Sequence, residues 1–130
     1  MILDTTFIID LMNAEKEAVN KLNELVKKKE AQIITSPSIF ELFSGLSRSK
    51  KPEQEKEKIV TTIKNQIILD LDNISAEKGG EVDGMLIKKG KTIQPIDSMI
   101  AGIALTKKEK ILTRNVKDFS KIKGLEVETY

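Results

Sequence analysis

Short apolar runs and helically spaced apolar stripes follow one another along most of this chain. The short runs are bounded by polar or turn-forming residues and predict strands at residues 2–3, 32–35, 67–72 and 110–113, with a fifth at the sheet edge over 125–130. Between them, apolar residues recur three and four positions apart, which predicts helices around residues 7–11, 18–26, 37–46, 59–63, 82–86 and 95–105. The pattern therefore alternates strand and helix.

This alternation is typical of an α/β fold, in which a mostly parallel sheet of four or five strands lies between two layers of helices. Ser75 is expected to cap the helix that ends near Gly90. No internal repeat or linker interrupts the pattern, so residues 1–130 are expected to form a single domain. In open parallel sheets, ligands bind beyond the carboxyl ends of the strands.

Composition limits the chemistry that this chain can perform. It has 22 basic and 20 acidic residues, a net charge of +2 that by itself argues for no polyanionic partner. It contains neither cysteine nor histidine, which excludes thiolate nucleophiles, imidazole bases and zinc sites built from these ligands. No apolar run approaches the roughly 20 residues of a membrane span, and the first residues do not look like a signal peptide. A cytoplasmic protein with no membrane contact is expected.

Four acids occupy positions where such a sheet would place a site. Asp4 follows the first strand, Glu41 lies on the helix after the second strand, Asp97 begins a later helix and Asp118 follows the fourth strand. Each has an ordinary interpretation as well. Asp4 and Asp97 would serve as helix caps, Glu41 as a solvated helix residue and Asp118 as a loop residue.

Taken together, the four acids favour a different interpretation. Carboxylates from separate segments that meet in a partly buried pocket would repel one another unless a cation neutralised them. Ligation by oxygen alone selects Mg²⁺ or Mn²⁺ over zinc. The sequence thus predicts a divalent metal site at the carboxyl edge of the sheet.

Four blocks of sequence contain these acids: "MILDTTFIIDLM", "SPSIFEL", "IQPIDSMIAGIAL" and "ILTRNVKDF". They cover nearly the whole chain and resemble the blocks of the PIN domain family, in the order in which that family has them. They are most similar to those of toxin ribonucleases of the VapC type. The resemblance implies a PIN-like α/β/α fold and Mg²⁺- or Mn²⁺-dependent endoribonuclease activity. It also implies a homodimer and inhibition by a small antitoxin protein.

By the same resemblance, Asp4, Glu41 and Asp97 occupy the family's acid positions, and either Asn115 or Asp118 fills the fourth. Two hydroxyl residues, Thr6 and Ser36, also match family positions and are expected to orient Asp4 or a water molecule.

Basic residues offer contacts to an RNA backbone. Arg48 and Arg114, together with the lysines of "SKK" and "KKGK", are candidates to bind its phosphates. Solvation is the alternative role for each of them.

Other functions remain open at this stage. A phosphoryl-transfer enzyme could use Asp4 as its nucleophile, although no second acid follows two residues later. An RNA-processing nuclease outside any toxin–antitoxin pair would carry the same acids. A catalytically impaired module that binds RNA or protein is compatible with Asn115 in the fourth block. Apolar residues of the first two helices and the Pro37 helix would form either core or a groove for an antitoxin helix.

Overall fold

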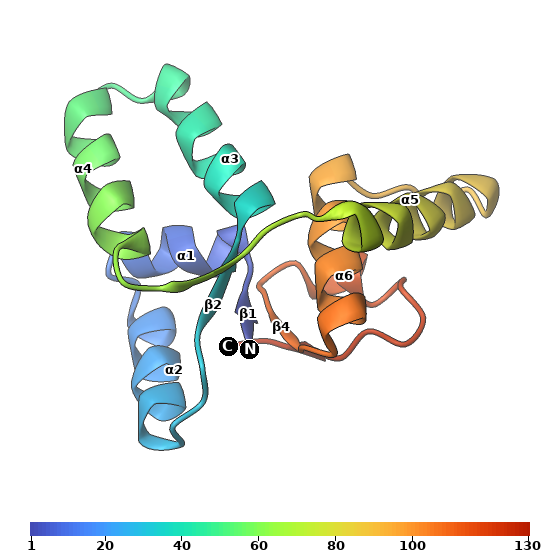
Figure 1. Cartoon of the computed structure of the whole chain (residues 1–130). Helices are drawn as coiled ribbons and strands as arrows, with labels where there is room; N and C mark the ends of the chain where they lie inside the picture. The colour runs from blue at the N-terminus through green and yellow to red at the C-terminus, as the bar shows by residue number, and fades with distance from the viewer.

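The computed structural model describes all residues, 1–130, and the helices and strands lie close to the predicted ranges (Figure 1). The strands are β1 (Ile2–Leu3), β2 (Ile33–Thr35), β3 (Ile67–Leu69), β4 (Ile111–Leu112) and β5 (Val127–Glu128). The helices are α1 (Thr5–Met12), α2 (Lys16–Lys27), α3 (Ser36–Ser44), α4 (Pro52–Ile63), α5 (Asn73–Lys88), α6 (Pro95–Lys107) and α7 (Val116–Phe119), with a 3₁₀ turn, η1 (Gly45–Arg48), after α3.

All five strands pair in parallel, in the order β3-β2-β1-β4-β5. The chain first builds outward from β1 to β2 and β3, then returns to place β4 and β5 on the other side of β1. The order reverses between β1 and β4, and this reversal leaves a crevice at the carboxyl ends of these two strands. Asp4 and Thr113 directly follow them.

The central strands β1, β2 and β4 are buried on both faces, and their successive side chains point to opposite sides of the sheet. Ile2, Ile33 and Ile111 belong to one apolar cluster, with residues of α5, α6 and α7. The residues that follow them, Leu3, Ile34 and Leu112, belong to a second cluster with residues of α1, α2, α3 and α4. The predicted three-layer α/β/α arrangement is confirmed, and Figure 1 shows the two groups of helices on either side of the strands.

Helices α5 and α6 cross at two glycines. A Cβ atom on Gly102 would stand 2.4 Å from the Ser75 carbonyl oxygen and 2.6 Å from the Gly79 nitrogen, and a Cβ on Gly79 would stand 2.8 Å from the Ser98 carbonyl oxygen. Side chains at these positions would push the two backbones apart. The glycines therefore set the distance between the helices, and with it the position of the first turn of α6.

Two predicted helix caps differ from the structure. Asp72 rather than Ser75 caps α5, because its carboxylate accepts a hydrogen bond from the Ser75 backbone N–H at 2.9 Å. Gln94 rather than Asp97 is the N-cap of α6, since Pro95 is the first residue of that helix. Asp97 consequently lies inside the first turn, where it is free for another role.

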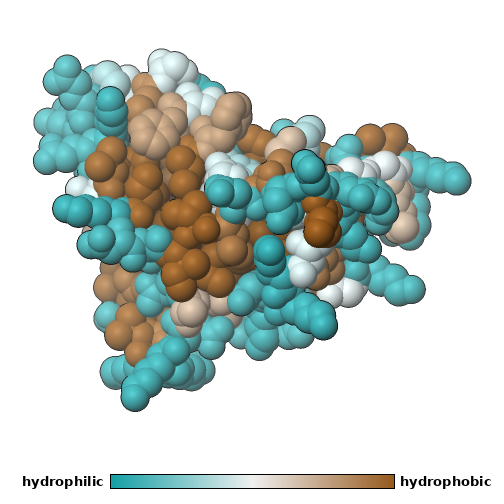
Figure 2. All heavy atoms as spheres, viewed as in Figure 1, coloured by the Kyte–Doolittle hydropathy of each residue, from teal (hydrophilic) through white to brown (hydrophobic).

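Apolar surface is concentrated on one side of the molecule. The exposed large apolar residues of this side include Phe40, Phe43, Val60, Ile67 and Ile68, from α3, α4 and the edge strand β3. Figure 2 shows this surface as a brown area over the α3–α4 side. None of the helices combines the length and the apolar character that a membrane crossing requires.

Candidate functional site

The carboxylate of Asp4 lies at the end of β1, where two hydroxyl groups hold one of its oxygens. Its Oδ2 accepts hydrogen bonds from Thr113 Oγ1 at 2.7 Å and Thr6 Oγ1 at 2.9 Å. Its Oδ1 is buried and has no hydrogen-bond partner. The interpretation of Asp4 as a side-chain cap of α1 is wrong, because its carboxylate accepts no bond from the backbone of that helix. An unpartnered buried carboxylate oxygen is costly unless something else binds it.

Asp97 lies in the first turn of α6, and the charges of the other three acids affect its pKa. Burial is the main cause that raises the pKa of its carboxyl from 3.8 to about 7, and the charges of Asp4, Glu41 and Asp118 raise it further. The four acids predicted from separate segments are therefore brought within electrostatic reach of one another. Without a cation, the Asp97 carboxyl is therefore only partly ionised near neutral pH.

Glu41 is half-buried on α3 rather than fully solvated. Its Oε1 accepts a hydrogen bond from Thr5 Oγ1 at 2.7 Å. Burial raises the pKa of Glu41, the Thr5 hydrogen bond opposes this shift, and the charge of Asp4 adds to it. Thr5 Oγ1 also lies 3.0 Å from Ser38 Oγ, a hydroxyl that is itself fully buried. The side chain of Glu41 is thus oriented by the start of α1.

The two candidates for the fourth block, Asn115 and Asp118, are hydrogen-bonded to each other. The Asn115 amide nitrogen donates to Asp118 Oδ2 at 3.1 Å and to Asp97 Oδ2 at 3.4 Å. Lys121 Nζ donates to Asp118 Oδ1 at 3.1 Å. The Asn115 hydrogen bond is the main cause that lowers the pKa of Asp118, and Lys121 also lowers it. Asn115 contacts Asp97 directly, whereas Asp118 reaches it through Asn115.

The structure places the other predicted residues in different ways. Thr6 contacts Asp4, as described above. The Ser36 hydroxyl accepts a hydrogen bond from the Leu71 backbone N–H at 3.0 Å and makes none with Asp4, so the expectation that it orients Asp4 is not supported. Arg48 is exposed and lines a pocket of about 290 Å³ that also includes Glu41. Arg114 forms an ion pair with the buried Asp10 at 3.0 Å.

Sequence reasoning missed three hydroxyl residues that support the acids: Thr5, Ser38 and Thr113. It also missed the role of Asp10, whose Oδ2 accepts a hydrogen bond from Tyr130 Oη at 2.5 Å. A signal for Thr113 was present in the sequence, because this threonine is the last residue of the predicted fourth strand, while Asp4 directly follows the predicted first strand. Residues that follow adjacent parallel strands meet at the same edge of the sheet.

The donor set suits a hard cation, although the acids do not form a ready-made cage. No three acidic side chains are grouped closely enough to hold a metal ion between them as they stand. Asp4 Oδ1 has no hydrogen-bond partner, and the charges of the other three acids raise the pKa of Asp97. Both observations indicate that the site lacks positive charge. Carboxylate and amide oxygens are the ligands that Mg²⁺ and Mn²⁺ prefer. The residues present therefore fit a divalent ion of this kind.

Comparison with known proteins shows the family to which the fold belongs. The profile of the PIN domain matches residues 1–125. Among curated relatives, the chain is 29% identical to the tRNA(fMet)-specific endonuclease VapC of Shigella flexneri, over 98% of this chain and 96% of the relative. It is 30% identical to Ribonuclease VapC2 of Rickettsia felis, with the same coverage. The chain belongs to the PIN domain family.

Solved structures of high similarity come from complexes of such proteins. VapBC2 from Rickettsia felis bound to a promoter DNA fragment superposes with a TM-score of 0.89 and 29% identity, over 99% of this chain and 97% of that one. DNA-bound VapBC from Salmonella typhimurium gives a TM-score of 0.86 and 28% identity, over 98% and 96%. The predicted PIN-like fold is confirmed.

Proposed function

We propose that this protein is a metal-dependent endoribonuclease and the toxin of a toxin–antitoxin pair. The observation that carries the proposal is the buried, unpartnered Oδ1 of Asp4 at the point where the strand order reverses. Its curated relatives are named as an endonuclease and a ribonuclease, which supports the same function.

Asp4, Glu41 and Asp97 would hold the ion, with Asp118 or Asn115 completing the set. Mg²⁺ and Mn²⁺ both suit these ligands. When bound there, a divalent cation would offset the charge of a phosphodiester and make a neighbouring water more acidic.

The chain's own residues prepare this site. Thr6 and Thr113 hold Asp4 so that Oδ1 remains available, and Thr5 orients Glu41. Proton removal from the attacking water falls to a carboxylate, because the chain has no histidine. Attack by water on the phosphorus with release of the 3′ oxygen gives 5′-phosphate and 3′-hydroxyl ends.

Two arginines flank the acids and are proposed to bind phosphates of the RNA. Arg48 has no acidic partner and lines the same pocket as Glu41. Arg114 is already paired with Asp10, and its side chain is still 62% exposed. Arg48 is therefore the more available of the two, and its loss is expected to affect RNA binding more.

An antitoxin is proposed to cover the α3–α4 side. VapC-type relatives of similar fold were crystallised as VapBC complexes. The Glu41 pocket includes Ile9, Met12 and Ile59 beside Arg48, which gives an apolar groove with a basic residue at its side. The exposed Phe40, Ile67 and Ile68 leave apolar surface on the same side for a homodimer contact.

The experiment compares wild-type protein, Asp4→Asn and the exposed control Glu77→Gln, purified free of any partner. Wild type and the control should bind Mn²⁺ in calorimetry and cleave single-stranded RNA, whereas Asp4→Asn should lose most of both. The absence of saturable Mn²⁺ binding to the wild type would instead indicate a non-catalytic module. Cleavage by Asp4→Asn at the wild-type rate would exclude this site.

A further inference from the structure

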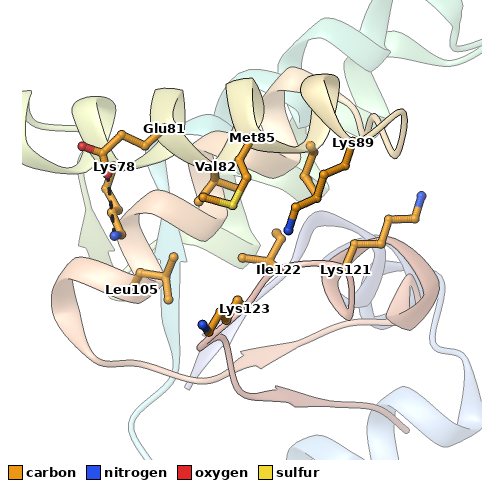
Figure 3. Close-up of a pocket in the computed structure, with 10 residues that line it drawn as sticks. Lys78, Glu81, Val82, Met85, Lys89, Leu105, Lys121, Ile122 and Lys123 are labelled. Atoms are coloured by element: carbon orange, nitrogen blue, oxygen red, sulfur yellow. Dashed lines mark ion pairs between the residues drawn. The ribbon is translucent and has the colours of Figure 1, made fainter.

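A second pocket lies between α5, the end of α6 and the segment that follows α7. Its volume is about 190 Å³, and five apolar side chains form its floor: Val82, Met85, Leu86, Leu105 and Ile122. Figure 3 shows Val82 and Met85 pointing from α5 toward Leu105 and Ile122. Pockets for drug-sized ligands occupy about 300–1,000 Å³, so this one suits a smaller group.

Lysines surround this floor. The pocket is lined by Lys78, Lys89, Lys121 and Lys123, against one acid, Glu81. Lys78 is paired with Glu81 at 3.7 Å, and Lys121 with Asp118 at 3.1 Å. Lys89 and Lys123 have no acidic partner and are exposed. The rim is therefore strongly positive, although the whole chain carries a net charge of only +2.

The lysine-rimmed pocket is connected to the proposed active site by side chains. Lys121 lines the pocket and donates to Asp118, and Asn115 bridges Asp118 to Asp97. Three consecutive polar contacts thus lead from the rim of the pocket to Asp97, whose pKa is raised in part by the charges of the other three acids.

We propose that the lysine-rimmed pocket binds one nucleotide of the RNA chain next to the linkage that is cleaved. The base lies on the apolar floor, and Lys89 and Lys123 bind the phosphates on either side. This proposal rests on the proposed nuclease function and adds a substrate subsite to it. The pocket is lined only by aliphatic, methionine, lysine and glutamate side chains, so it contributes affinity and little choice between bases.

The first test removes the two unpaired lysines. Lys89→Ala/Lys123→Ala is compared with Lys16→Ala/Lys27→Ala, which removes two exposed, unpaired lysines from α2 and so changes the net charge equally. The pocket variant should raise KM for single-stranded RNA with kcat unchanged. The slope of log affinity against log salt should become shallower by about 1.4, since each phosphate contact contributes about 0.7. The control variant should match wild type in both.

The second test places a negative charge at the floor. Met85 is 53% exposed and Ile87 is 56% exposed, and both belong to α5, but only Met85 lines the pocket. Met85→Glu should raise KM for RNA, whereas Ile87→Glu should not. Thermal melting of each variant checks that the fold is intact, and exposure at both positions makes unfolding an unexpected outcome.

The outcomes separate the two proposals. If wild type cleaves RNA and both pocket variants behave as their controls do, the subsite is wrong and the nuclease assignment stands. If wild type neither binds nor cleaves RNA, the function itself is wrong. If Lys16→Ala/Lys27→Ala raises KM for RNA as much as the pocket variant does, the effect comes from the loss of positive charge alone. The proposed subsite would then be wrong.

Discussion

Thr113 Oγ1 donates a hydrogen bond to Asp4 Oδ2 at 2.7 Å, although the two residues lie 109 positions apart in the chain. The bond joins the ends of β1 and β4 at the reversal of strand order. It leaves Asp4 Oδ1 as the free atom of that carboxylate. The hydroxyl of Thr113 is therefore expected to determine which oxygen of Asp4 faces the site.

Thr113→Val is expected to lower Mn²⁺ affinity and RNA cleavage by about 10- to 100-fold, the usual cost of removing a group that orients a metal ligand. Valine keeps the shape of threonine and removes only the hydroxyl. Thr113→Ser should restore most of the affinity, because it returns the donor. Calorimetric Mn²⁺ titration and initial cleavage rates measure both. Equal affinity for the valine and serine variants would show that the hydroxyl has no such role.

The raised pKa of Asp97 predicts how stability depends on pH in metal-free protein. The pKa of this carboxyl is about 7 in the folded protein and 3.8 in the unfolded chain. Between these two pH values the folded protein therefore binds one proton more than the unfolded chain. The resulting stabilisation is present at low pH and is lost as pH rises through 7. Tm of the metal-free protein should fall between pH 6 and pH 8, and added Mn²⁺ should raise Tm more at pH 8.

Asp97→Asn is the control for this pH effect, since the amide does not titrate. Its Tm should change less than that of wild type between pH 6 and pH 8. Scanning calorimetry in chelator-treated buffer measures the difference. A wild-type Tm that is as insensitive to pH as that of the variant would contradict the assignment of the shift to Asp97.

The crossing of α5 and α6 depends on Gly102. Gly102→Ala should lower the free energy of unfolding by about 3 kcal/mol or more, because the new Cβ would meet backbone atoms that cannot move independently. Gly80→Ala, on the neighbouring helix α5, is the matched control, because its Cβ would meet nothing within 4 Å. It should stabilise by about 0.5–1 kcal/mol. Urea unfolding gives both values, and a neutral Gly102→Ala would contradict the close packing.

Tyr130 fixes the chain's last residue to α1. Its hydroxyl donates to the buried Asp10, and its ring packs edge-on against Phe7, with 4.9 Å between the ring centroids. Burial and the bond to Asp10 raise the pKa of Tyr130, so the hydroxyl stays protonated at any ordinary pH. Tyr130→Phe should cost about 1–3 kcal/mol, as it leaves one oxygen of Asp10 unpaired. Thr129→Ala, at an exposed position, should cost little in the same denaturation assay.

The sequence predicted the elements and the acids because both are local properties. Apolar spacing depends on the geometry of each strand or helix alone, and the alternation of the two restricts the sheet to a parallel one. Asp4, Asp97 and Asp118 could be proposed because each follows a strand or begins a helix that the pattern locates, and Glu41 because it lies on the helix after the second strand. The helix caps were less predictable, and Ser75 and Asp97 lie in the first turn of their helices instead of at the N-cap.

The sequence by itself determined the alternating α/β architecture and the acids that end its strands and begin its helices. Only the tertiary structure decided how those acids are held and charged. Thr113 holds Asp4 across 109 residues, Thr5 orients Glu41 on another helix, and burial beside three acids raises the pKa of Asp97. Hydrogen bonds and charge repulsion depend on distances between segments, and the strand order that brings β4 beside β1 sets those distances.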